Sequence, residues 1–164
     1  MSATLHVRGA ARADMPAVAR LAAQLVRLHH AFDTQRFLCL EPLEPGYERW
    51  LTSELPRRDA VILVAEKREG EADPTLVGYA YGRLEARDWN NLLDAHGALH
   101  DVFVAEEARK LGAGALLVRA MLARLRELGA PRVVLHTAVQ NEAAQRLFAS
   151  VGFRPTMIEM TAEL

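Results

Sequence analysis

Two glycines at alternate positions follow a short apolar run and precede an apolar helical pattern. The segment reads Arg109-Lys110-Leu111-Gly112-Ala113-Gly114. Glycines at a helix start leave main-chain N–H groups uncovered, and the helix dipole adds positive potential there, so this bend suits a phosphate or pyrophosphate. The spacing argues against two common phosphate sites. Leu117 stands where the dinucleotide fingerprint needs its third glycine, and the chain has no Gly-Lys-Ser or Gly-Lys-Thr.

The bend and its flanks resemble a known family. With the preceding Val102-Phe103-Val104 run and an acidic turn, the segment resembles motif A of the GCN5-related N-acetyltransferases (GNAT). The stretch from Asn141 to Phe153 is similar to motif B of that family, with Asn, Ala, Leu and Gly-Phe in the family's order. Together the motifs cover residues 98–155, whereas the N-terminal half matches only in the order of its elements.

The resemblance implies a fold and a reaction. The expected fold is a single GNAT domain over residues 1–164, of mixed α/β class. It has a mostly antiparallel sheet of six to seven strands, flanked by about four helices and splayed at the cofactor site. The expected reaction is acetyl transfer from acetyl-CoA to a primary amine of a small molecule or peptide, by direct attack in a ternary complex. Two alternatives stay open: a non-catalytic acyl-CoA-binding module, and a protein N-terminal or lysine acetyltransferase.

The resemblance also implies how the cofactor is held. Its pyrophosphate is expected on the bend at 109–114, and its pantetheine arm beside the motif A strand, in a gap that opens toward residues 132–136. A main-chain N–H near Val102 would polarise the thioester oxygen. Arg109 and Lys110 either add charge at the phosphates or are solvated helix-end residues. The predicted cofactor-binding residues are Val102, Phe103, Val104, Arg109, Lys110, Leu111, Gly112, Ala113, Gly114, Asn141 and Phe148.

The proton acceptor is expected on the motif A strand. Many family members carry Glu four residues before the position of Val104, where this chain has His100, followed by Asp101. Strand alternation places His100 on the face of Val102 and Val104, and Asp101 on the other. A neutral imidazole could take an ammonium proton directly or through water, and Asp101 could orient a water or bind the substrate cation. The structural alternative is that His100 is a hydrogen-bonded histidine on a half-buried strand.

The proton donor is where the chain departs from the family. Phe148 stands where many members have a tyrosine that protonates the departing thiolate. The sequence therefore predicts that Phe148 packs against the core or the cofactor. The thiolate then leaves as an anion, or water or another hydroxyl protonates it, with Tyr79 and Tyr81 as distant candidates. Asn141 is expected to cap a helix, to contact the cofactor, or both.

The acceptor side is less defined. Polar and aromatic residues between the first two helices and before the motif A strand are candidates for recognising a polar amine, although each is also common at surfaces: His29, His30, Asp33, Trp89 and Asp94. No metal site is expected, because the histidines lack flanking ligands and there is no Cys pair. Family members often dimerise, so a homodimer is possible.

The elements that must position these residues follow from periodicity and turn chemistry. Strands are expected at 4–8, 61–65, 76–84, 99–104, 133–135 and 156–161. Helices are expected at 14–29, 45–55, 112–128 and 141–152. The strands at 61–65 and 76–84 form a predicted hairpin around the turn at 70–74.

Bulk properties fit a small enzyme domain. The chain has 164 residues, 51% hydrophobic and 25% charged, which is ordinary for one globular domain. A net charge of −1 provides no global field to attract nucleic acid or an acidic membrane. Cys39 is the only cysteine, and the first 11 residues have no signal-peptide core. With no apolar run long enough to cross a bilayer, these features predict a cytoplasmic protein.

Overall fold

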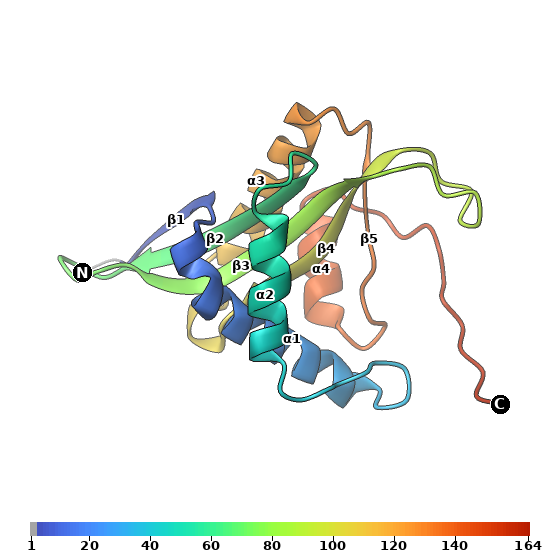
Figure 1. Cartoon of the computed structure of the whole chain (residues 1–164), viewed down its shortest axis with the longest axis horizontal. Coiled ribbons are helices and arrows are strands. Elements are labelled where there is room, and N and C mark those ends of the chain that lie inside the picture. The colour runs from blue at the N-terminus through green and yellow to red at the C-terminus, as the bar shows by residue number, and fades with distance from the viewer. Residues whose placement is uncertain (1–2) are drawn as a thin grey trace.

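The computed structural model describes residues 3–164. Its centre is a five-stranded sheet in the order β1-β2-β3-β4-β5 (Figure 1). The strands are β1 (Thr4–Gly9), β2 (Ala60–Arg68), β3 (Thr75–Glu85), β4 (His96–Val104) and β5 (Val133–Leu135). The helices are α1 (Met15–Phe32), α2 (Glu44–Glu54), α3 (Ala113–Glu127) and α4 (Glu142–Ser150). Two short 3-10 turns, η1 (Arg12–Asp14) and η2 (Glu106–Ala108), precede α1 and follow β4.

The first four strands are antiparallel neighbours, and β5 alone runs parallel to its neighbour β4. A bulge interrupts the β3–β4 register between Tyr81 and Gly82, where Tyr81 pairs with Asp101 but Gly82 pairs with Leu99. His100 is thus the extra residue on β4. A bulge of this kind reorients the side chains that follow it.

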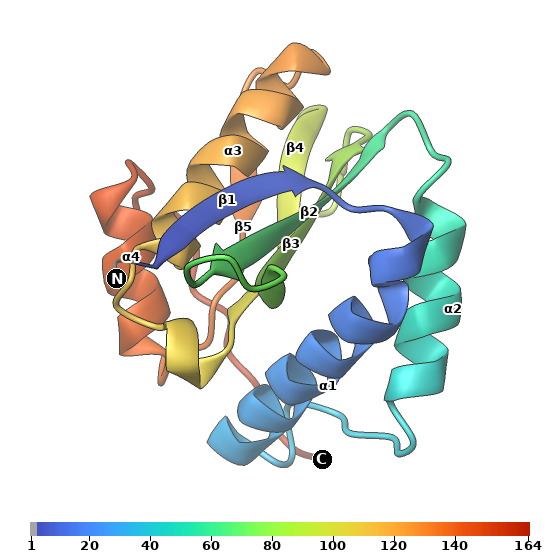
Figure 2. The same ribbon diagram turned by 90° about the vertical axis from the view of Figure 1, so that its left-hand side faces the viewer.

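The two faces of the sheet carry different helices (Figure 2). On one face, α3 and α4 pack through Leu117, Met121 and Phe148 onto strand residues such as Leu63 and Leu99. On the other face, α1 and α2 bury the alternate strand residues. That set comprises Ile62, Val64, Tyr79, Tyr81 and Phe103, with Met15, Val18, Leu21, Ala22 and Leu51 from the helices. The alternating pattern of the strands therefore supplies two cores.

Local sequence signals set the helix limits. The N-cap of α3 is Gly112, with φ of 90°, and Gly129 follows its end with φ of 95°. The α4 helix begins after Asn141, whose side-chain oxygen accepts a hydrogen bond from the Ala144 N–H at 3.2 Å. The start and end of α3 and the start of α4 were predicted from the sequence. Glycine suits the left-handed region at the ends of α3, and asparagine suits the N-cap of α4.

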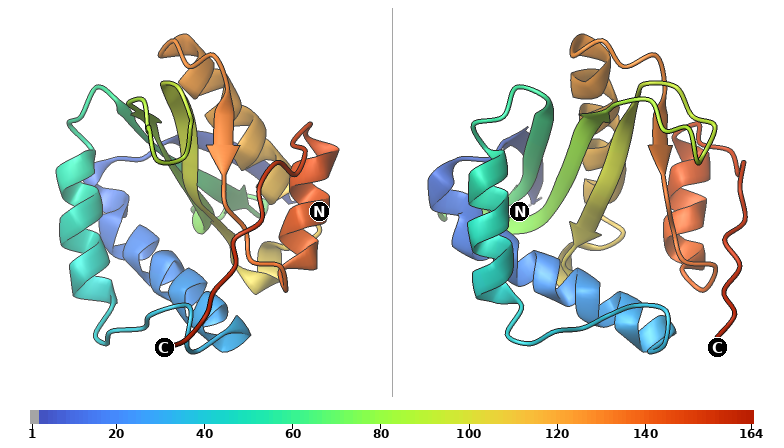
Figure 3. Two further views of the ribbon diagram at one scale, coloured as in Figure 1. Left: turned by 90° about the vertical axis from the view of Figure 1, so that its right-hand side faces the viewer. Right: turned by 45° about the vertical axis from the view of Figure 1, so that its right-hand side comes forward.

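The strand predicted at 156–161 is wrong, so the sheet has five strands instead of six to seven. Residues 153–164 have no regular secondary structure. Met157, Ile158 and Met160 are 76%, 82% and 89% exposed, so these apolar side chains reach neither core. The segment runs from α4 toward the end of α1, where Glu159 pairs with Arg36 (Figure 3). An apolar segment becomes a strand only where it finds a pairing edge, and sequence pattern alone does not reveal that edge.

Among residues 3–164, no helix combines the length and apolarity needed to cross a membrane. The predicted domain also includes Met1 and Ser2, which lie outside the described residues.

Candidate active site

The bend between β4 and α3 has the backbone geometry of an anion cradle. Lys110 and Gly112 both lie in the left-handed region, with φ of 65° and 90°. A Cβ built on Gly112 would meet no heavy atom of the described residues within 4 Å, so its missing side chain leaves open space. The N–H groups of the first turn of α3 have no acceptor within the helix, because they precede its first hydrogen-bonded turn. The bend therefore fits a phosphate group.

Gly114 has a second role, in packing. A Cβ on Gly114 would lie 3.0 Å from Cδ2 of Leu147 on α4 and 3.8 Å from Cγ2 of Val104 on β4. The absence of a side chain lets α4 approach the start of α3. Gly114 therefore has a packing role in the fold, in addition to its place in the bend.

Arg109 ties the bend to the end of β4. Its Nε donates to the Val104 carbonyl at 3.3 Å, and its guanidinium carbon lies 5.8 Å from the centre of the Phe103 ring. The side chain is therefore directed back along the strand.

Beyond Leu99, one edge of β4 is not paired with β5. The β4–β5 register covers Gly97 to Leu99 opposite Val133 to Leu135, and β5 ends there. Beyond this point the Ala105 N–H donates to the Val77 carbonyl of β3 at 2.8 Å. Since successive strand residues present their N–H and C=O groups to opposite edges, Val102 and Val104 present theirs away from β3. This edge leads directly to the bend at 109–114, and it could accept an extended group as an added strand.

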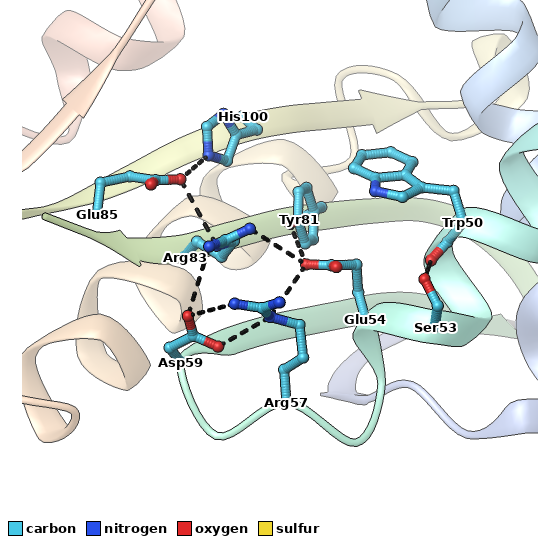
Figure 4. Close-up of polar contacts among 9 residues, drawn as sticks. All are labelled: Trp50, Ser53, Glu54, Arg57, Asp59, Tyr81, Arg83, Glu85 and His100. Carbon is cyan, nitrogen blue, oxygen red and sulfur yellow. Dashed lines mark hydrogen bonds and ion pairs between the residues drawn. The ribbon is translucent and has the colours of Figure 1, made fainter.

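The predicted face of His100 is wrong, and the bulge is the reason. His100 lies on the same side of the sheet as Tyr81, whose ring stacks on the imidazole with centroids 5.5 Å apart (Figure 4). Its Nε2 is 3.0 Å from Oε1 of Glu85, and 42% of the side chain is exposed. Val102 and Val104 instead pack toward α3. The bulge thus brings His100 and Asp101 onto one face, where simple alternation separates them.

Asp101 lies beneath the α1 and α2 helices. Its Oδ2 accepts a hydrogen bond from the Tyr79 hydroxyl at 2.9 Å, and Tyr79 is fully buried. Burial raises the pKa of the Asp101 carboxyl, while the Tyr79 hydrogen bond and positive charge on His100 or His29 oppose that rise. Burial and the adjacent Asp101 also raise the pKa of Tyr79. Asp101 therefore places a half-buried carboxyl on the same face of the sheet as His100.

A polar network below His100 was not found from the sequence. Glu54, only 7% exposed, accepts a hydrogen bond from the Tyr81 hydroxyl at 2.6 Å. Arg57 and Arg83 each place a nitrogen 3.7 Å from the same carboxylate (Figure 4). Burial and Glu54 raise the pKa of Tyr81. Both hydroxyls considered as proton donors, those of Tyr79 and Tyr81, therefore donate to carboxylates.

Phe148 and Asn141 have structural roles that the fold makes visible. Phe148 is 7% exposed and packs edge-on against Phe153, with ring centroids 5.8 Å apart. Of the two packing partners predicted for Phe148, the core and the cofactor, the structure shows the core. Asn141 caps α4, as described above, which realises one of its two predicted roles.

The five acceptor candidates fall into two groups. His29 and His30 lie near the end of α1, where their Nδ1 atoms contact the carbonyls of Leu25 at 2.9 Å and Phe37 at 2.6 Å. Asp33 follows, and its carboxylate accepts the main-chain N–H groups of the next turn.

Trp89 and Asp94 lie instead in the β3–β4 hairpin loop, which projects away from the end of α1 (Figures 1 and 3). There Arg87 pairs with Asp94 at 2.9 Å and covers the Trp89 ring. The structure therefore does not bring the two groups together. Across residues 3–164, no three His, Cys, Asp or Glu side chains converge as a metal site would require.

Comparison with known proteins defines the family. The profile of the acetyltransferase (GNAT) family matches residues 23–153. The chain therefore belongs to the GNAT family, as the two motifs predicted. Acetyl-CoA is the cofactor of this family.

Curated relatives share parts of the chain. A mycothiol acetyltransferase of Corynebacterium aurimucosum is 32% identical over 115 residues, which are 70% of this chain and 35% of that protein. The uncharacterized N-acetyltransferase YobR of Bacillus subtilis is 35% identical over 65 residues, 40% of this chain and 26% of YobR. The chain thus spans about a third or less of the length of these relatives.

Solved structures share the whole fold. A tetramutant of the BH1408 protein from Bacillus halodurans superposes with a TM-score of 0.79 at 22% identity, covering 97% of this chain and 99% of that one. The aminoglycoside N-acetyltransferase AAC(6')-Iy in complex with CoA gives 0.79 at 14% identity, over 100% and 97% of the chains. A glucosamine-6-phosphate N-acetyltransferase from Arabidopsis thaliana gives 0.66 at 19% identity, over 98% of each chain. The GNAT fold expected from the motifs is confirmed.

Proposed function

We propose that this protein is an acetyl-CoA-dependent N-acetyltransferase that acts on a small primary amine by direct attack in a ternary complex. The observation that carries the proposal is the continuous run from the unpaired edge of β4 to the bend at 109–114. An extended pantetheine arm has main-chain partners along that edge, and a pyrophosphate has N–H donors at the start of α3. Family membership supports the same assignment.

The residues around this run suit the reaction. Bound acetyl-CoA supplies an activated thioester whose carbonyl carbon forms the new C–N bond as the C–S bond breaks. The Val102 N–H, which faces the open edge, is the donor best placed to stabilise charge on the thioester oxygen. His100 takes a proton from the ammonium group of the acceptor, directly or through water, so that a neutral amine attacks. Asp101 follows His100 in the chain, and its carboxylate stabilises the positive charge that develops on the imidazole.

Glu85 is the positioning group for the base. Because its carboxylate contacts Nε2 of His100, it favours the tautomer with hydrogen on Nε2 and leaves Nδ1 free to accept. Arg83, with Nε 3.6 Å from the same oxygen, holds Glu85 in turn. A hydroxyl donor is not part of the mechanism, since Phe148 has none. Water would therefore protonate the departing thiolate.

Small amines are the proposed acceptors because two structural neighbours, AAC(6')-Iy and glucosamine-6-phosphate N-acetyltransferase, are named for small-molecule acceptors. The test is a screen for CoA release with amines and peptides, paired with calorimetric titration of acetyl-CoA. The proposal predicts binding and amine-dependent CoA release. Binding without turnover of any acceptor would assign a non-catalytic binding module, and preference for peptides would assign a protein acetyltransferase.

A further inference from the structure

An apolar hollow lies beside the proposed catalytic face. It has a volume of about 260 Å³ and is formed by the N-terminal half of α2 with the loop before it. Its lining residues are Leu40, Pro42, Leu43, Gly46, Tyr47 and Trp50. Leu40 and Trp50 are 73% and 40% exposed, so large apolar groups are presented to solvent at its rim. Exposed apolar side chains that cluster around a concavity are typical of a ligand site.

Packed aromatic side chains connect the hollow to His100. Leu43, Tyr47, Trp50 and Glu54 follow one another at spacings of four, three and four, so they share one face of α2. The Trp50 ring contacts Tyr47 and Tyr81, with centroid distances of 5.7 and 5.0 Å. Tyr81 in turn stacks on His100 (Figure 4). A chain of touching aromatic rings therefore leads from the hollow to the proposed base.

Five carboxylates near this path are paired with arginines. Beside the hollow, Arg27 binds Glu41 at 2.8 Å and Glu44 at 3.0 Å. Next to His100, the Glu54, Asp59 and Glu85 carboxylates share Arg57 and Arg83. Recognition of a polycation needs several carboxylates with free acceptor capacity, because each added ammonium group must recover its lost hydration. This face instead offers apolar surface and the half-buried carboxyl of Asp101.

We infer that the acceptor is a small primary amine that carries an aromatic or branched aliphatic group. The apolar group lies in the hollow against Trp50 and Leu40, and the amine reaches His100 and Asp101. This inference rests on the proposed function and adds the substrate class. It argues against polyamines and aminoglycosides, whose charges would find their carboxylate partners occupied.

The test compares acceptors and variants in the presence of acetyl-CoA. The acceptors are 2-phenylethylamine, spermidine and the aminoglycoside neamine. The expected kcat/KM is higher for 2-phenylethylamine than for either polycation by about tenfold or more. Leu40→Glu places a charge in the hollow at an exposed position that is not needed for folding, and it is expected to raise the KM for 2-phenylethylamine about tenfold. Trp50→Ala is expected to act in the same direction.

Leu92→Glu is the matched control. Leu92 is 89% exposed in the β3–β4 hairpin loop, so the same substitution there tests the effect of an added surface charge alone. Its kinetics are expected to equal those of the wild type. Sedimentation of the wild type and of Leu40→Glu is measured in parallel, because a second copy of the chain is the other candidate occupant of the hollow.

The outcomes separate the inference from the proposed function. Acetylation that favours spermidine or neamine, or an unchanged KM in Leu40→Glu, overturns the substrate class and leaves the acetyltransferase standing. A wild-type dimer that Leu40→Glu dissociates assigns the hollow to a second copy and also overturns the inference. Acetyl-CoA binding with no turnover of any acceptor overturns the proposed function, and the inference falls with it.

Discussion

A substitution at Gly112 can test the proposed cofactor binding separately from the stability of the fold. It combines a φ of 90° with open space where a side chain would project. The Cβ of an Asp here therefore meets no heavy atom of the described residues within 4 Å. The substitution introduces backbone strain of about 1–2 kcal/mol, the usual cost of the left-handed region for an L-residue. It also places a carboxylate at the start of α3, where the account puts the pyrophosphate.

The expected loss of affinity follows from simple electrostatics. One carboxylate at about 5 Å from one phosphate charge, with an effective dielectric constant of about 20, costs roughly 3 kcal/mol. That corresponds to a loss of about 100-fold in the affinity for acetyl-CoA. Backbone strain alone does not weaken binding to this extent, because it destabilises the free and bound protein alike.

Gly129 provides the matched control. Its φ is 95°, and a Cβ there also meets no heavy atom of the described residues within 4 Å, but it lies at the opposite end of α3. Gly112→Asp and Gly129→Asp should lose similar stability in thermal unfolding, and only Gly112→Asp should lose affinity in calorimetric titration with acetyl-CoA. Wild-type affinity in folded Gly112→Asp, or an equal loss in both variants, would refute the phosphate assignment.

Three further predictions concern the base, the helix contact and an ion pair. His100→Ala should lower kcat by about 100-fold or more while the Kd for acetyl-CoA changes little; a pH–rate profile equal to that of the wild type would remove His100 as the base. Gly114→Ala brings a Cβ to within 3.0 Å of Cδ2 of Leu147, so the Gly114→Ala/Leu147→Ala pair should lose less stability in urea unfolding than the sum of the two single changes. Additive losses would place the strain elsewhere. Asp14→Asn should cost about 1–3 kcal/mol at pH 7, because hydrogen bonds from Arg8 at 2.7 and 3.0 Å lower the pKa of Asp14. A carboxyl with a lowered folded pKa stabilises the fold above its unfolded pKa of about 4 and loses that contribution as the pH falls, so the stability difference between the variant and the wild type should shrink progressively below about pH 4; a difference that stays constant as the pH falls would mean that the charge is not its source.

Much of the fold is encoded in short-range signals that a sequence displays directly. Glycines mark both ends of α3, and Asn141 marks the start of α4. The alternating apolar residues of β2 define two faces, which α1 and α3 then cover. The bend at 109–114 belongs to the same category, because its geometry depends on the left-handed Gly112 within a single turn.

The candidate catalytic face depends on long-range contacts and was predicted less well. The bulge opposite Tyr81 and Gly82 arises from the pairing of β3 with β4, so the sequence around His100 does not reveal it. The Glu54–Tyr81 hydrogen bond joins residues 27 positions apart and exists only because α2 docks on β3. Alternation within one strand could not anticipate either feature.

The central claim is that the edge of β4 and the bend at 109–114 together hold acetyl-CoA. Amide hydrogen exchange of the full chain, measured with and without saturating acetyl-CoA, tests it most directly. The account predicts slower exchange in two segments, at Val102 to Val104 and at Leu111 to Ala115. Acetyl-CoA binding that protects other segments while these two exchange at unchanged rates would contradict it.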